Sequence, residues 1–216
     1  MCVIFTAEPG VMPSMLDLAR MADRNPDGAG IAWHDPETNT VKVRKFVDCN
    51  RMLGYIGTHY DELEDVAVLG HFRIATHGAV NITNCHPFRV SCGVMAHNGV
   101  AGDYVDGPYS SDSRNAIRAW DADHSIDLKG QGRFALLTDD GRIEWLQGGV
   151  ALRRGIRVSN MLWRPSRPRR TSEWGSYDGR TSEWGSYDGR TSEFRTLPAA
   201  GDTPTVASLA SAGVTE

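Results

Sequence analysis

The ten residues MCVIFTAEPG, numbered 1–10, decide the fold of this chain. Cys2 to Ala7 form a short apolar run, which is typical of a strand that is buried on both faces. The run opens on a cysteine directly after the initiator methionine. Because cysteine is small, an aminopeptidase can remove Met1, and we expect Cys2 to become the first residue of the mature protein.

A terminal cysteine would carry a thiol and a free α-amino group on one residue. The reference pKa of an α-amino group is about 8, so a fraction of it is neutral at pH 7 and can take the thiol proton, directly or through water. Cys2 is therefore a candidate nucleophile whose own α-amino group would be the base. The alternative is a small buried residue that opens a strand, and the rest of the sequence decides between the two.

Four short blocks follow Cys2 in the sequence: NPDGAGIAW at 25–33, GHFRIATHG at 70–78, NCHPF at 84–88 and MAHNG at 95–99. Together with Cys2 they closely resemble the class II glutamine amidotransferase domain of the N-terminal-nucleophile hydrolase superfamily. The resemblance covers residues 2 to 150 or so and keeps the order of the blocks. It implies that the chain is an enzyme that hydrolyses the amide of glutamine through a Cys2 thioester and releases ammonia and glutamate.

Strand-like segments are spread along the first part of the chain, and two segments have helical spacing. We expect helices at 12–23 and 111–121, and a hairpin turn at Asp139-Asp140-Gly141. Many strands, short turns and only two or three helices predict an α+β fold in which helices cover antiparallel sheets. The resemblance implies the four-layer α/β/β/α sandwich of the superfamily. The expected strands are 2–7, 30–34, 41–46, 66–74, 93–97, 134–139 and 143–147.

Amide hydrolysis needs hydrogen-bond donors for the oxygen that becomes negative. The resemblance assigns this oxyanion hole to the Asn98 side chain and the Gly99 backbone N–H, which a ligand can approach closely because glycine has no side chain. One such donor typically contributes about 2.7 to 4 kcal/mol to catalysis. Asn-Gly is also a common hairpin turn, and both interpretations can hold at once.

The resemblance also assigns residues that would hold the ends of glutamine. Arg73, near the end of a predicted strand, would bind the α-carboxylate through paired donors, with Thr76 and His77 adding hydrogen bonds; otherwise it would be a solvated strand-end arginine. Asp112 would bind the α-amino group, or serve only as a helix N-cap. The sequence here is Ser-Asp-Ser-Arg, whereas the family usually has Ser/Thr-Asp-Thr-Glu, so the Asp112 assignment rests on a partial match.

Three further residues are expected to support the site. Asp27 and Gly28 match the family's loop beside the nucleophile, and His86 matches its His-Pro pair, which shapes a loop. A zinc site made of Cys85, His86, Cys92 and His97 is the alternative, but structural zinc ligands usually come in pairs separated by two to four residues. We expect no metal and no cofactor, since the chain also lacks a phosphate-binding loop followed by Lys-Ser/Thr.

Composition limits the partners. Lys and Arg number 23 against 27 Asp and Glu, giving a net charge of −4 and a pI near 6.0, so no positive field attracts nucleic acid or an anionic membrane. No signal peptide or long apolar run is present, and four dispersed cysteines do not make a disulfide framework. We therefore expect a cytoplasmic protein with a small-molecule substrate, either glutamine or a γ-glutamyl amide.

The composition changes after Trp163. We assign residues 1–163 to the catalytic domain and 164–216 to a low-complexity tail with two identical ten-residue repeats, TSEWGSYDGR. Units this short and polar cannot share a core, so disorder is expected. The alternative is that the repeat aromatics, with the arginines that precede them, bind single-stranded nucleic acid or a protein; these aromatics are Trp174, Tyr177, Trp184 and Tyr187.

Longer family members pass the ammonia to a fused synthase or isomerase domain. Since only the polar tail follows here, we expect either a separate ammonia-accepting subunit or simple hydrolysis. Two alternatives remain open at this point: a hydrolase of a γ-glutamyl conjugate or another amide, and a non-catalytic binding module.

Overall fold

The computed structural model describes residues 1–75 and 79–165. The predicted substrate contacts Thr76 and His77 and the whole repeat segment lie outside the described residues. The strands within them form two sheets in which every pair of neighbours is antiparallel.

The larger sheet has the strand order β3-β2-β4-β1-β10-β9, so the strand that follows Cys2 lies near its middle. Its members are β1 (Val3–Ala7), β2 (Ala29–Asp35), β3 (Thr40–Phe46), β4 (Val68–Phe72), β9 (Val150–Arg153) and β10 (Ile156–Val158). The smaller sheet has the order β5-β6-β7-β8. Its members are β5 (Phe88–Val90), β6 (Gly93–Asn98), β7 (Arg133–Thr138) and β8 (Ile143–Gln147).

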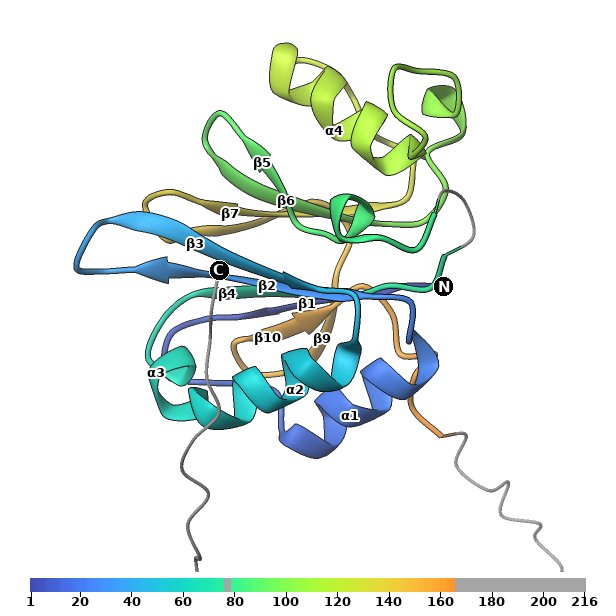
Figure 1. The fold of residues 1–216 in the computed structure, drawn as a ribbon. Coiled ribbons are helices and arrows are strands. Elements are labelled where there is room, and N and C mark those ends of the chain that lie inside the picture. The colour runs from blue at the N-terminus through green and yellow to red at the C-terminus, as the bar shows by residue number, and fades with distance from the viewer. Residues whose placement is uncertain (76–78, 166–216) are drawn as a thin grey trace, which may run out of the picture. The chain divides into compact units, whose positions relative to one another are not determined.

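Helices cover the outer face of each sheet. Figure 1 shows α1 (Met15–Arg24), α2 (Cys49–Thr58) and α3 (Tyr60–Glu64) against the larger sheet, and α4 (Asp112–Ala122) against the smaller one. Two 3-10 turns, Ile82–Asn84 and Gly102–Tyr104, lie in the connections. The predicted α+β fold with two antiparallel sheets is confirmed, in a four-layer α/β/β/α arrangement.

Three hydrophobic clusters fill the spaces between these four layers. Along β1, Val3 and Phe5 belong to the cluster under α1 and α2, whereas Ile4 belongs to the cluster between the two sheets. Side chains alternate between the faces of a strand, so β1 must be apolar on both faces. This explains why the first residues read as a continuous apolar run, and the predicted buried strand is confirmed.

Helix α2 and the short strands β5, β9 and β10 were not predicted. Helix α2 contains Gly54 and Gly57, and glycine lowers intrinsic helix propensity by about 1 kcal/mol relative to alanine. Asp48 caps the helix by accepting from Asn50 N at 2.8 Å, and buried Met52 and Ile56 pack it onto the larger sheet. Tertiary packing therefore compensates for a weak local preference. The three missed strands have only three or four residues each, too few for a period of two to stand out.

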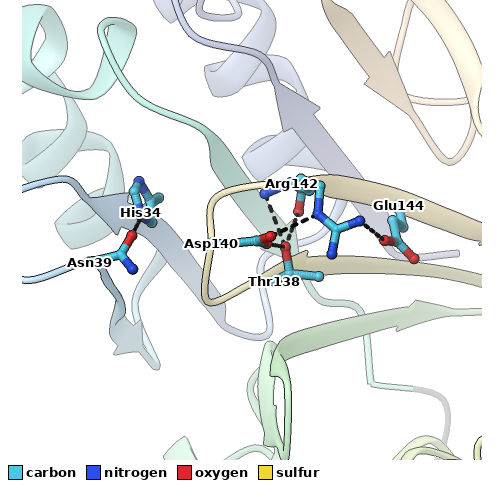
Figure 2. Close-up of polar contacts among 6 residues, drawn as sticks. All are labelled: His34, Asn39, Thr138, Asp140, Arg142 and Glu144. Carbon is cyan, nitrogen blue, oxygen red and sulfur yellow. Dashed lines mark hydrogen bonds and ion pairs between the residues drawn. The ribbon is translucent and has the colours of Figure 1, made fainter.

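The predicted hairpin turn between β7 and β8 is confirmed. Gly141 has φ +81° and its N–H donates to Thr138 O at 2.9 Å. Figure 2 shows the side chains that brace this turn: Thr138 contacts Asp140, and Arg142 pairs with Asp140 at 2.9 Å and with Glu144 at 3.6 Å. The hairpin fixes the outer end of the smaller sheet, away from the residues that carry the chemistry.

None of the helices in the described part of the chain combines the length and apolarity that spanning a bilayer requires.

Candidate active site

Cys2 directly precedes β1, and its sulfur contacts the chain that leaves β4. The thiol lies 3.4 Å from Ile74 O, and Ile74 N lies 3.4 Å from the same sulfur. The sulfur can therefore donate its proton to the carbonyl oxygen and accept from the N–H. This pairing holds the Cys2 side chain at the edge of the sheet where β1 begins and β4 ends.

A cavity of about 100 Å³ lies beside the Cys2 side chain. Its lining residues come from the start of the chain, from the segment after β4 and from the end of β6. They are Met1, Cys2, Ile74, Asn98, Gly99 and Val100. The three residues predicted to be catalytic thus share one cavity, and Met1 is 61% exposed at its rim.

Burial raises the pKa of the Cys2 thiol above its ordinary value. The Ile74 N–H, the positive amino terminus and the Arg73 guanidinium oppose this shift, but desolvation is the largest contribution. The thiol therefore stays protonated at neutral pH. Because the thiolate is the reactive form, a nucleophilic role for Cys2 requires a base.

Asn98 is the last residue of β6 and is only 2% exposed, and Gly99 follows it. Gly99 has φ +148°, and a Cβ there would lie 2.8 Å from Gly132 Cα, so only glycine fits this turn. After Gly99 the chain runs on to α4 rather than back along β6, whose sheet partners are β5 and β7. The alternative of a simple Asn-Gly hairpin is therefore wrong.

His97 braces the same turn from the opposite face of the strand. Its Nε2 lies 2.7 Å from Gln131 O and its Nδ1 lies 2.7 Å from Ser113 Oγ. A carbonyl oxygen only accepts, so Nε2 carries the proton and Nδ1 accepts from the Ser113 hydroxyl. Burial lowers the pKa of His97, which favours this neutral tautomer and fixes the strand end that carries Asn98.

Arg73 follows β4 and is only 5% exposed, so the alternative of a solvated strand-end arginine is wrong. Its Nη1 donates to Ala79 O at 3.2 Å. The backbone of Arg73 is also fixed, since Arg73 N donates to Gly28 O at 2.7 Å. A buried cation at this point lies close enough to Cys2 to favour its thiolate.

Asp112 is the first residue of α4, and its Oδ2 accepts from Ala101 N at 2.7 Å. It therefore ties the loop after Gly99 to the helix. The helix N-cap is Ser111, whose hydroxyl accepts from Arg114 N at 3.4 Å, so Asp112 itself is not the cap. Asp112 does not line the cavity beside Cys2.

Asp27 and Gly28 hold the segment that contacts the Cys2 sulfur. Asp27 Oδ2 accepts from Ala75 N at 2.8 Å, and Asp27 N donates to Arg73 O at 2.9 Å. Gly28 has φ +129°, and a Cβ there would lie 2.6 Å from Cys85 Sγ. The two residues thus fix the backbone on both sides of Ile74 without lining the cavity.

His86 is 4% exposed and lies next to a second buried imidazole, His71 on β4. The two ring centroids are 4.3 Å apart, and none of the four ring nitrogens has a hydrogen-bond partner within the described residues. Burial, with the neighbouring positive groups, lowers the pKa of His71 to about 3 and that of His86 well below its ordinary value. The pair is therefore neutral at physiological pH.

This pair predicts a stability that depends on pH. Unfolding exposes both imidazoles, which then titrate near 6.5, so the unfolded chain binds more protons and stability falls as the pH drops below 6.5 toward 3. Each histidine contributes a slope of about 1.4 kcal/mol per pH unit in that window. His71→Phe has a similar shape and removes one titrating group that makes no hydrogen bond.

We expect the urea midpoints of His71→Phe to fall less steeply between pH 6.5 and 4.5 than those of the original chain. His124→Phe, which changes an exposed imidazole, is the control and should keep the original slope. Parallel slopes for all three proteins would contradict the assignment.

No group of three or more His, Cys, Asp or Glu side chains within residues 1–75 and 79–165 could hold a metal ion. The sulfur of Cys85 contacts Phe46 O and Asn81 O, each at 3.4 Å. Both nitrogens of His97 are engaged in the bonds described above.

Beyond the cavity lining, two more residues that contact the site were not singled out in the sequence. Ser159 Oγ lies 2.8 Å from Asn98 Nδ2, and Asn160 Nδ2 donates to Cys2 O at 2.9 Å. They follow β10, beyond the stretch that carries the family motifs, and no local pattern distinguishes a Ser-Asn pair from a turn. Only the pairing of β10 with β1 places them beside the nucleophile.

A cysteine ahead of a buried central strand, facing an Asn-Gly turn in a four-layer α/β/β/α sandwich, defines a candidate thiol hydrolase of the N-terminal-nucleophile kind. A family model described as "Glutamine amidotransferases class-II" matches residues 12–126. The chain belongs to the class II glutamine amidotransferase family.

Curated relatives are similar over the same region. Residues of this chain are 33% identical over 111 residues to a glutamine–fructose-6-phosphate aminotransferase of Caldanaerobacter subterraneus, a match that covers 49% of this chain and 18% of that protein. The enzyme of the same name from Mycobacterium tuberculosis is 35% identical over 99 residues, covering 45% of this chain and 16% of the relative. The chain thus spans less than a fifth of the length of these relatives.

Among solved structures, the glutamine phosphoribosylpyrophosphate amidotransferase of Bacillus subtilis aligns with a TM-score of 0.44 and 18% identity, over 73% of this chain and 41% of that one.

Proposed function

We propose that this chain hydrolyses the side-chain amide of glutamine, with Cys2 as the nucleophile after removal of Met1. One observation carries the proposal: in a chain of this family, Cys2 shares a small cavity with Asn98 and Gly99. The raised pKa of the Cys2 thiol means that the thiol needs a base before it can attack, and the free α-amino group would be that base.

The reaction begins when the α-amino group takes the thiol proton and Cys2 Sγ attacks the γ-carbonyl carbon. The carbonyl electron pair moves onto the oxygen, which accepts hydrogen bonds from the Asn98 side chain and the Gly99 N–H. The tetrahedral intermediate collapses, the C–N bond breaks, and the protonated amine returns the proton to the leaving ammonia. Water then attacks the thioester and frees glutamate and the Cys2 thiol.

Side chains that bind the α-carboxylate and the α-ammonium group of glutamine would position its amide beside the Cys2 sulfur. We assign the α-carboxylate to Arg73, whose charge is already held near Cys2, with Thr76 and His77 as further donors. Asp112 is the proposed partner of the α-ammonium group. Its carboxylate now binds Ala101 N, so this role requires that it keep an oxygen available for the substrate.

The ammonia acceptor is proposed to be a separate protein. The relatives carry names of aminotransferases that act on fructose 6-phosphate, and the matched region is less than a fifth of their length. We propose that this chain supplies ammonia to a distinct synthase subunit, by analogy with these glutamine-dependent relatives.

The test is an assay of the full chain with glutamine as the amide donor. We expect ammonia and glutamate in equal amounts, none from asparagine, and an intact mass that lacks Met1. Faster release of 4-nitroaniline from γ-glutamyl-4-nitroanilide than of ammonia from glutamine would instead identify a γ-glutamyl-conjugate hydrolase. Retention of Met1 on an active protein would exclude the α-amino group as the base.

A further inference from the structure

The segment that follows β10 continues its pairing with β1 by one residue. Ser159 N donates to Ile4 O at 2.9 Å, and Ile4 N donates to Ser159 Oγ at 2.9 Å. The side-chain oxygen of Ser159 therefore takes the place of a backbone carbonyl in the ladder. Ser159 is fully buried, so this hydroxyl has no access to solvent.

The same hydroxyl reaches across to the other sheet. Ser159 Oγ lies 2.8 Å from Asn98 Nδ2, although the two residues are 61 positions apart in the chain. Asn160 Nδ2 lies 3.4 Å from Ser159 Oγ and 2.9 Å from Cys2 O. Ser159 and Asn160 thus link the backbone of the nucleophile to the amide of the proposed oxyanion hole.

The hydrogen-bond donors around Ser159 Oγ outnumber the lone pairs that can accept from them. Three N–H groups surround Ser159 Oγ, from Ile4, Asn98 and Asn160, whereas a hydroxyl offers two lone pairs and one proton of its own. That proton has no acceptor within the described residues. At the other end of the Asn98 amide, Oδ1 is buried and also has no partner there.

A half-turn of the Asn98 amide pairs Oδ1 with the Ser159 hydroxyl proton and leaves the NH₂ group as the one without a protein partner. The Ser159 hydroxyl then donates to Oδ1 and still accepts from Ile4 N. The NH₂ group moves to the position without a protein partner, on a side chain that lines the Cys2 cavity. The amide oxygen and nitrogen are nearly equal in size, so the turn requires no other movement.

We propose that Ser159 is a positioning residue that sets the orientation of the Asn98 amide. Its hydroxyl, already committed to accepting from Ile4 N, holds Asn98 Oδ1 and thereby directs the NH₂ group toward the ligand oxygen. Without this hydroxyl the amide can present its own oxygen, which would repel a developing negative charge. The inference rests on the proposed amide hydrolysis, in which Asn98 stabilises the oxyanion.

The kinetic test is Ser159→Ala alone and in the Asn98→Ala background. We expect kcat for glutamine to fall about 10- to 100-fold, by analogy with the loss of outer-shell partners that orient metal ligands, with KM little changed. Since Ser159 acts through Asn98, the double variant should be no slower than Asn98→Ala alone. Independent losses that multiply would overturn the proposal.

A second readout separates positioning from a purely structural role. Alkylation of Cys2 by iodoacetamide, measured on the N-terminal peptide by mass spectrometry because Cys92 is also a partly buried free cysteine, reports access to the nucleophile but does not require the Asn98 donor. We expect Ser159→Ala to alkylate at the original rate, as should the surface control Ser125→Ala. An equal fall in alkylation and in hydrolysis would show that Ser159 merely holds β1 in place, and would overturn the proposal.

Side-chain amide NMR decides the orientation even if the variant does not fold. In chain labelled with 15N-asparagine, the Asn98 NH₂ signals are those lost in Asn98→Ala or Asn98→Asp. The proposal expects no cross-peak between these protons and the Ile4 amide proton, because the NH₂ group points away from Ser159; a strong cross-peak would overturn it. If the original chain releases no ammonia, the proposed function fails, and this spectrum still decides the orientation.

Discussion

Replacing Cys2 by alanine is expected to lower ammonia release from glutamine at least about a thousand-fold, since loss of a covalent nucleophile removes the route rather than slowing a step. The contacts with Ile74 hold this side chain in one place, and burial raises the pKa of its thiol. Steady-state ammonia release and intact mass after mixing with glutamine measure the effect. Only the original chain can accumulate the glutamyl thioester.

Cys92→Ala is the matched control for this variant. Cys92 is also a partly buried free cysteine, but it lies in the turn between β5 and β6, away from the cavity. It should keep the original rate. Equal rates for Cys2→Ala and the original chain would end the interpretation of Cys2 as the nucleophile.

Asn98→Ala is expected to reduce kcat about 100- to 1,000-fold with a small change in KM, the usual effect of losing one oxyanion donor. Asn98 is 2% exposed and lines the cavity with Cys2. Asn98→Asp should lose as much, because a carboxylate keeps the shape but offers no donor and adds a repelling charge. Initial rates over a range of glutamine concentrations give kcat and KM separately.

The exposed Asn50, which lies in the first turn of α2, provides the control Asn50→Ala. Its kinetic constants should match those of the original chain. A loss below about tenfold in both Asn98 variants would place the oxyanion elsewhere, and a change confined to KM would make Asn98 a substrate-binding residue.

Much of the candidate site could be predicted because the resemblance assigns its residues from short blocks of the sequence. Cys2 opens an apolar run, Arg73 follows a buried strand, and Asn98-Gly99 needs a backbone that only glycine allows at its second position. Each signal depends on residue types a few positions apart. The helix α2, with its two glycines, has the opposite character, since its local preference is weak and packing decides it.

The sequence by itself predicted the nucleophile candidate and the buried central strand, because an apolar run is a property of neighbouring residues, and the resemblance carried by its ordered short blocks predicted the family and the roles of Asn98 and Gly99. Only the tertiary structure decided that Asp112 ties the loop after Gly99 to α4, and that Ser159 meets Asn98. Those contacts join residues 11 and 61 positions apart. The first exists because α4 packs on the smaller sheet and the second because the two sheets pack face to face, and the hydrophobic effect that drives both acts on buried area without regard to distance along the chain.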